Sequence, residues 1–83
     1  MIAPIVNGRL PQQHDFRSAC CQDISTGGLG FLSPTLPSAN EYVIALGSPP
    51  GLTHMRMRVV HTTYLPDDGS YLVGCTFVGR VDW

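Results

Sequence analysis

The chain contains no lysine: its five cationic side chains are all arginine, and six acidic residues leave a formal net charge of −1. Charged residues make up 13% of the sequence, about half the usual share of a soluble domain. Non-specific binding to nucleic acids requires many cations that neutralise phosphates. We therefore expect no DNA or RNA partner, although two well-placed arginines would suffice for a small anion.

Long apolar runs are also lacking. No segment of the sequence approaches the roughly 18 apolar residues of a membrane span, and the opening MIAPIVNGR has neither the charged nor the apolar region of a secretion signal. We expect no membrane span and a cytoplasmic location.

Cysteine is scarce: the chain has three, Cys20, Cys21 and Cys75, an odd number that includes an adjacent pair. This arrangement does not provide a disulfide framework. Adjacent residues on a strand point to opposite faces, so Cys20 and Cys21 are poorly placed to ligate one metal. We expect buried or half-buried thiols.

Recognised metal-binding and catalytic patterns are absent from the sequence. The histidines His14, His54 and His61 are scattered and form no zinc-binding spacing with the cysteines. Ser25 has no G-x-S-x-G frame and no acid and histidine partners that spacing would identify. We expect no metal, no resident cofactor and no enzymatic activity.

At 83 residues the chain is long enough for one domain, and nine glycines and seven prolines divide it into short pieces that favour strands. Residues 1–15 contain Pro4, Asn7-Gly8 and Pro11, which predict an irregular N-terminal arm. Residues 16–83 are expected to form the folded domain.

Alternating and continuous apolar patterns predict five strands, at residues 16–22, 29–33, 41–47, 53–65 and 71–79. The apolar run at 41–47 is typical of a strand buried on both faces. The turn PDDGS joins the last two strands into a long hairpin over 53–79. These features predict an all-β fold, a small antiparallel barrel of about six strands with little or no helix.

The stretch QDISTGGLGFLSP, residues 22–34, concentrates hydrogen-bonding groups and glycines in one loop. Asp23 is an acceptor and Ser25 both donates and accepts, while Gly28 lets a ligand approach the backbone without a Cβ in the way. A planar ligand such as a guanine edge fits this chemistry. The alternative is a tight turn in which Asp23 and Ser25 satisfy the turn's own N–H groups and the glycines supply positive φ.

The order of these residues, D-x-S-x-x-G over residues 23–28 between a strand and an apolar run, resembles the second signature of PilZ domains. The segment RVVHTTYLPDDGSYLVGCTFVG is similar to the long hairpin that ends the PilZ barrel. The resemblance covers roughly residues 16–80. It implies a bacterial regulatory β-barrel that binds cyclic di-GMP, in which Asp23 and Ser25 contact a guanine, Gly27 shapes the turn and Gly28 permits close approach.

The other half of the PilZ signature, R-x-x-x-R, is missing from this sequence. Arg9 and Arg17 are eight residues apart, and the family's spacing would place the missing pair at or before Met1. Arg17, on the segment that enters the motif, is the local candidate for a substitute phosphate contact. We therefore expect a cyclic di-GMP-binding domain that is weak as this chain, or alternatively a ligand-free module that binds a protein partner or a second copy of itself.

Overall fold

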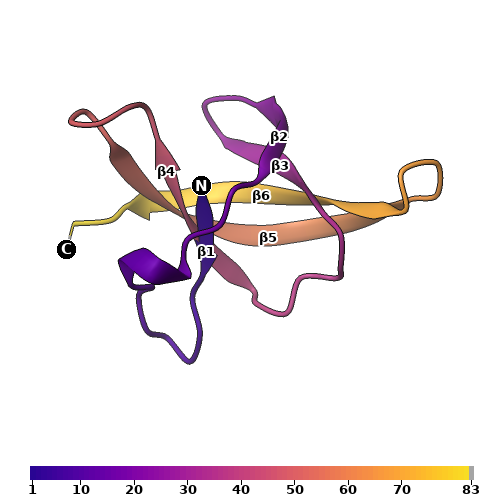
Figure 1. The fold of residues 1–83 in the computed structure, drawn as a ribbon, viewed down its shortest axis with the longest axis horizontal. Helices are drawn as coiled ribbons and strands as arrows, with labels where there is room; N and C mark the ends of the chain where they lie inside the picture. Colours follow the sequence, from indigo (N-terminus) through magenta and orange to yellow (C-terminus); the bar gives the residue numbers. More distant parts are fainter. Residues whose placement is uncertain (83) are drawn as a thin grey trace.

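The computed structural model describes residues 1–82, which form one six-stranded antiparallel sheet that curls into a half-barrel (Figure 1). The prediction of an all-β fold is confirmed. The strand order is β1-β4-β5-β6-β3-β2, so the sheet is built around the long central β5–β6 hairpin. The elements are β1 (Ile2–Pro4), the 3-10 helix η1 (Gln13–Asp15), β2 (Cys20–Ile24), β3 (Gly28–Ser33), β4 (Glu41–Leu46), β5 (Thr53–Leu65) and β6 (Ser70–Arg80).

The β5–β6 hairpin confirms the alternation and the turn chemistry read from the sequence. Its strands pair from Met55 and Arg80 to Leu65 and Ser70, and the turn closes with hydrogen bonds from the Asp68 and Gly69 N–H groups to the Leu65 carbonyl. Gly69 has φ of +63°, a conformation that glycine adopts without steric cost. The far end of the hairpin projects beyond the other strands (Figure 1).

One contiguous apolar cluster fills the concave side of the sheet. Val73 and Cys75 of β6 point into it, as the alternating pattern of the return strand predicts, and Phe77 packs against it. Strand β4 is buried on both faces, since consecutive residues Tyr42, Val43 and Ile44 are all buried. The cluster consists of Ile2, Leu29, Phe31, Tyr42, Ile44, Met57, Val73 and Cys75.

The N-terminal arm differs from the irregular segment that its prolines and Asn-Gly pair suggested. Residues Ile2–Pro4 form β1, which pairs with β4, and Ile2 joins the core. Most of the remaining arm is irregular, apart from η1. Pairing with β4, which is distant in sequence, supplies the hydrogen bonds that local sequence could not reveal.

The strand predicted at residues 16–22 is displaced. β2 runs instead over Cys20–Ile24, and all of its residues are exposed because it is an edge strand paired only with β3 in the described part of the chain. Upstream, Arg17 exchanges two backbone hydrogen bonds of 2.8 Å with Ile2. This bridge draws residues 16–19 away from β3 and links the segment entering β2 to β1, the other edge of the sheet.

Candidate functional site

The D-x-S-x-x-G motif forms the tight hairpin between β2 and β3. The Ser25 N–H donates to the Gly28 carbonyl at 2.9 Å, and the Ser25 hydroxyl accepts a hydrogen bond of 3.3 Å from the Gly27 N–H. Ser25 therefore stabilises its own turn through its side chain, as the tight-turn alternative proposed. Its O–H remains available as a donor, because the bond from Gly27 uses only the hydroxyl oxygen as an acceptor.

The tip of this hairpin is attached to β6. The Gly27 carbonyl accepts two hydrogen bonds, from the Phe77 N–H at 2.9 Å and from the Thr76 hydroxyl at 3.2 Å. Two donors on one strand hold the tip in a fixed position relative to the central hairpin. The motif is therefore a rigid part of the sheet surface.

Gly28 is required by strand packing. A Cβ at this position would overlap the Cys75 carbonyl oxygen and lie 3.0 Å from the Cys75 carbonyl carbon. At Gly27, in contrast, a Cβ would have open space around it. Neither glycine has positive φ, so the proposal that they supply left-handed backbone is wrong.

Four of the residues predicted from the motif line one open groove on the convex face of the sheet, with a volume of about 330 Å³. This lies at the lower end of the roughly 300–1,000 Å³ of small-molecule sites. The four are Asp23, Ser25, Gly27 and Gly28. The groove also contains residues of β3, β5 and β6, chiefly Gly30, Val60, His61, Leu72, Gly74 and Thr76.

The floor of the groove follows from the strand register. Asp23 pairs with Gly30, Gly30 with Gly74, and Gly74 with His61, which makes one row across four strands. The neighbours of both glycines in sequence, such as Phe31 and Val73, point into the core, so the row lies on the opposite face. Because neither glycine has a side chain, the His61 imidazole can lie over Gly74, and a shallow channel over Gly30 remains between this ring and Asp23.

His61 was not singled out from the sequence. Its imidazole lies over Gly74, where a Cβ would be 2.6 Å from Nε2 and 2.8 Å from Nδ1. The residue is exposed, so one face of the ring rests on the strand and the other borders the groove. A glycine in a strand interior often marks a close approach, and Gly74 is the sequence feature that could have indicated this site.

Asp23 presents an unused acceptor. Within residues 1–82 its carboxylate makes no hydrogen bond or ion pair, and the residue is exposed at the wall of the groove. The tight-turn alternative is therefore wrong for Asp23. A carboxylate with free lone pairs beside a backbone floor can accept hydrogen bonds from adjacent N–H groups of a planar ligand.

Arg17 lies outside this groove. Its guanidinium donates to the backbone carbonyls of His14 at 3.0 Å and Phe16 at 3.3 Å. It lines a separate open hollow of about 840 Å³ on the N-terminal arm, together with Arg9. Among the described residues, none of the arginines lines the groove at Asp23.

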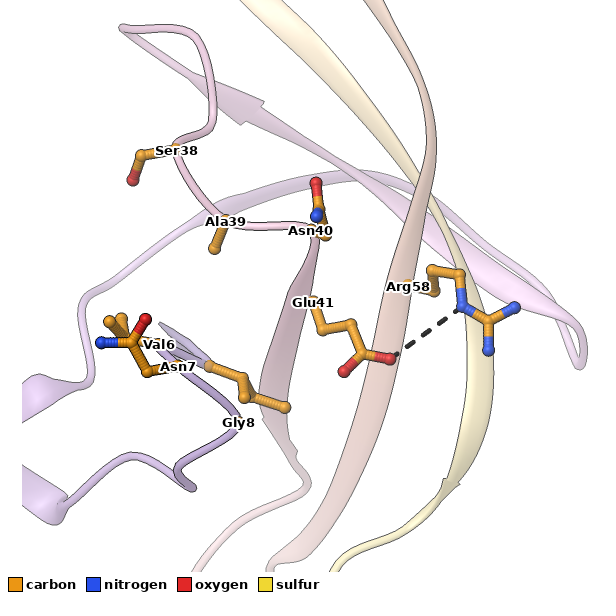
Figure 2. Close-up of a pocket in the computed structure, with 9 residues that line it drawn as sticks. Val6, Asn7, Gly8, Ser38, Ala39, Asn40, Glu41 and Arg58 are labelled. Carbon is orange, nitrogen blue, oxygen red and sulfur yellow. Dashed lines mark ion pairs between the residues drawn. The ribbon is translucent and has the colours of Figure 1, made fainter.

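A third hollow, of about 640 Å³, lies between the arm and the start of β4 (Figure 2). Figure 2 shows Glu41 and Arg58 side by side on one wall, with a closest N–O distance of 4.0 Å. Arg56 donates from Nε and Nη2 to Oε1 of the same carboxylate, at 3.1 and 2.5 Å. Arg56 and Arg58 of β5 therefore share the Glu41 carboxylate as an internal counter-ion.

The cysteines are free thiols. Cys20 and Cys21 are exposed on β2, contrary to the expectation of buried or half-buried thiols, because β2 is an edge strand. Cys75 is buried, and burial raises its pKa to about 11. No cluster of three or more potential metal ligands occurs within residues 1–82.

Comparison with known proteins gives no relative: no family model, no characterised protein and no solved structure matches the chain. Within residues 1–82, no helix has the length and apolar character needed to cross a membrane.

Proposed function

We propose that the domain is a PilZ-like regulatory module whose groove binds one guanine of cyclic di-GMP. The observation that supports this proposal is that Asp23, Ser25, Gly27 and Gly28 line a single groove in which the Asp23 carboxylate has no partner among the described residues. A guanine edge presents adjacent N–H donors, which one carboxylate can accept together.

The rest of the groove is compatible with a flat, polar ligand. Gly30 leaves room above the sheet, and the exposed ring of His61, which lies over Gly74, offers a surface on which a base can stack. Ser25 lines the same groove as Asp23, and its O–H can donate to a ring nitrogen or carbonyl. These contacts involve one guanine base of cyclic di-GMP, and no arginine among the described residues lines the groove to bind its phosphates.

Because no arginine among the described residues lines the groove, we expect a low affinity for cyclic di-GMP. A charge-assisted hydrogen bond contributes roughly 1.5–3 kcal/mol, so two missing arginines correspond to about 3–6 kcal/mol, or two to four decades in affinity. The R-x-x-x-R half of the PilZ signature would supply these cations. We therefore expect this chain alone to bind cyclic di-GMP weakly.

The alternative, a ligand-free module that recognises a protein, is favoured by the same lack of cations at the groove. Calorimetric or NMR titration with cyclic di-GMP distinguishes the two functions, with cyclic di-AMP as the control for guanine recognition. Ligand recognition predicts saturable binding in the high micromolar to millimolar range, on the order of −4 to −5 kcal/mol. A ligand-free module that recognises a protein predicts no saturable binding of cyclic di-GMP at any concentration.

Two variants test the assignment of residues. Asp23→Asn should weaken cyclic di-GMP binding by about 10-fold or more, because a neutral amide is a weaker acceptor and places donors against the guanine. Asp68→Asn removes the same charge at the remote hairpin turn and should leave binding unchanged. Adding an R-x-x-x-R segment ahead of the barrel should strengthen binding by about two to four decades; no gain would contradict the proposal.

A further inference from the structure

The outer part of strand β5 has an open edge. β5 spans Thr53–Leu65, but β4 pairs with it only from Thr53 to Arg58, and one further bond joins the Val59 N–H to the Asn40 carbonyl at 2.8 Å. Over residues 60–65 the described structure pairs β5 with β6 alone. The backbone groups of alternate residues there face away from the sheet.

This edge is exposed and uncharged. Val60 and Tyr64 are 57% and 54% exposed, and Thr62 and Thr63 are exposed between them. The segment VHTTYL contains β-branched and aromatic residues that favour strands, and it has no Lys, Arg, Asp, Glu or Pro. Natural proteins usually protect an open edge with charge, proline or a bulge, because unpaired backbone groups recruit another strand.

The other sheet edges carry such protection. β2 contains Asp23 and a bulge at Gln22, and β1 has only three residues and ends at Pro4. β5 has its own bulge at Val60, where the register with β6 shifts, and Pro66 follows the strand. The bulge and the proline delimit the open stretch to His61–Leu65 but leave that stretch itself unprotected.

We infer that two copies of this domain associate through the outer edge of β5, in antiparallel pairing centred on Thr62. In this register Thr62 lies opposite its own counterpart, and His61 lies opposite Thr63. Threonine pairs are favourable cross-strand neighbours, at roughly 0.2–1 kcal/mol each. In a dimer with a two-fold axis, the Thr62 pair lies on the axis and every other pair occurs twice, as an isologous interface requires.

The lack of charge on this edge of β5 favours a second copy of the domain as the binding partner. Self-pairing of a charged edge would place like charges opposite each other, which is destabilising, whereas His61–Leu65 has no acidic or always-cationic side chain. The tilted contact between Tyr64 and Tyr71, with ring centroids 5.1 Å apart, stiffens the end of the hairpin that is presented to the partner. His61 and Val60 also line the groove at Asp23, but Asp23 itself lies on β2, away from the paired edge. Asp23→Asn should therefore weaken ligand binding and leave the association unchanged.

The paired segment is short, so the association should be weak. The few residues paired on each side bury less than the roughly 1,200 Å² of stable interfaces, and a dissociation constant on the order of 10 µM to 1 mM is expected. Sedimentation velocity across about that concentration range should show a shift from monomer to dimer. In NMR spectra, the amide shifts of residues 60–65 should depend on concentration, and their hydrogen exchange should slow as concentration rises.

Two lysine variants locate the interface. Thr62→Lys places two cations opposite each other at the two-fold axis and should leave the protein monomeric over the whole range. Gln22→Lys adds the same charge to the exposed edge strand β2 and should dimerise like the unchanged protein. Thr62→Pro, which removes a backbone donor, should also abolish association, with far-ultraviolet circular dichroism confirming that the fold remains.

A protein that stays monomeric up to about 1 mM with unchanged amide shifts overturns the inference, as does dimerisation that survives Thr62→Lys. Loss of dimerisation in Gln22→Lys, with Thr62→Lys unaffected, would assign the interface to β2 and overturn it equally.

Discussion

The imidazole of His61 occupies the place above Gly74 where a side chain would begin, with Nε2 2.6 Å and Nδ1 2.8 Å from the position of a Cβ. The two residues are direct neighbours across β5 and β6. The contact holds the ring flat against the sheet and leaves the channel towards Asp23 open. His61 therefore keeps its orientation only while residue 74 lacks a side chain.

Gly74→Ala should displace His61 and destabilise the domain by about 1–2 kcal/mol, since the ring must leave its position or the strands must shift. His61→Ala in the same chain should recover most of that loss, which gives a coupling energy of roughly 0.5–2 kcal/mol in a double-mutant cycle. Urea unfolding of the four proteins measures it. Gly79→Ala, also on β6 but with open space around its Cβ, is the control and should behave like the unchanged protein.

Gly28→Ala should destabilise the fold by more than about 2 kcal/mol, because the added methyl group would overlap the backbone of Cys75. Gly27→Ala, one residue earlier in the same motif, should change stability by less than about 1 kcal/mol. Thermal unfolding without ligand provides the comparison. If the two variants have equal stability, the motif glycine is not required for strand packing.

The sequence predicted the fold well where local patterns determine it. The period of two, the PDDGS turn and the continuous apolar run identified β4, β5 and β6 within a residue or two. It failed for residues 16–24, where the strand begins only at Cys20 because Arg17 pairs with Ile2. Neither this bridge nor the pairing of β1 with β4 leaves a local pattern, since both depend on chain segments that are distant in sequence.

For the candidate site, too, local sequence patterns identified some residues and missed others. The motif residues Asp23, Ser25, Gly27 and Gly28 line one groove, because they belong to one hairpin. His61 was missed because strict alternation from Met57 and Val59 would place it on the concave face. The bulge at Val60 moves it to the other face, and an extra residue in a strand cannot be read from alternation alone.

Arg56→Ala should destabilise the domain by about 0.5–1 kcal/mol, whereas Arg58→Ala should have an effect within about 0.5 kcal/mol. Arg56 makes two hydrogen bonds to Glu41 Oε1, while Arg58 approaches Oε2 only to 4.0 Å. Chemical unfolding at low and at about 1 M salt checks the assignment, because screening should reduce the Arg56 effect. Equal losses in both variants would show that the two arginines share the carboxylate evenly.

The domain should lose stability in alkaline solution because of Cys75. Burial raises the pKa of this thiol from 9.0 to about 11, so the unfolded chain ionises at lower pH than the folded one. Stability is therefore complete below about pH 9 and decreases as the pH rises towards 11, by at most about 2–3 kcal/mol. Burial also raises the pKa of Tyr42, which adds to the loss in the same direction.

Urea unfolding at several pH values between 8 and 11, under reducing conditions, measures this decrease. Cys75→Ala should be less stable than the unchanged protein at pH 8, because a cavity replaces the sulfur, but its stability should fall less steeply with pH. Tyr42→Phe in that background should flatten the profile further. A Cys75→Ala profile parallel to that of the unchanged protein would show that the thiol ionises equally in the folded and unfolded states, and that its burial does not control alkaline stability.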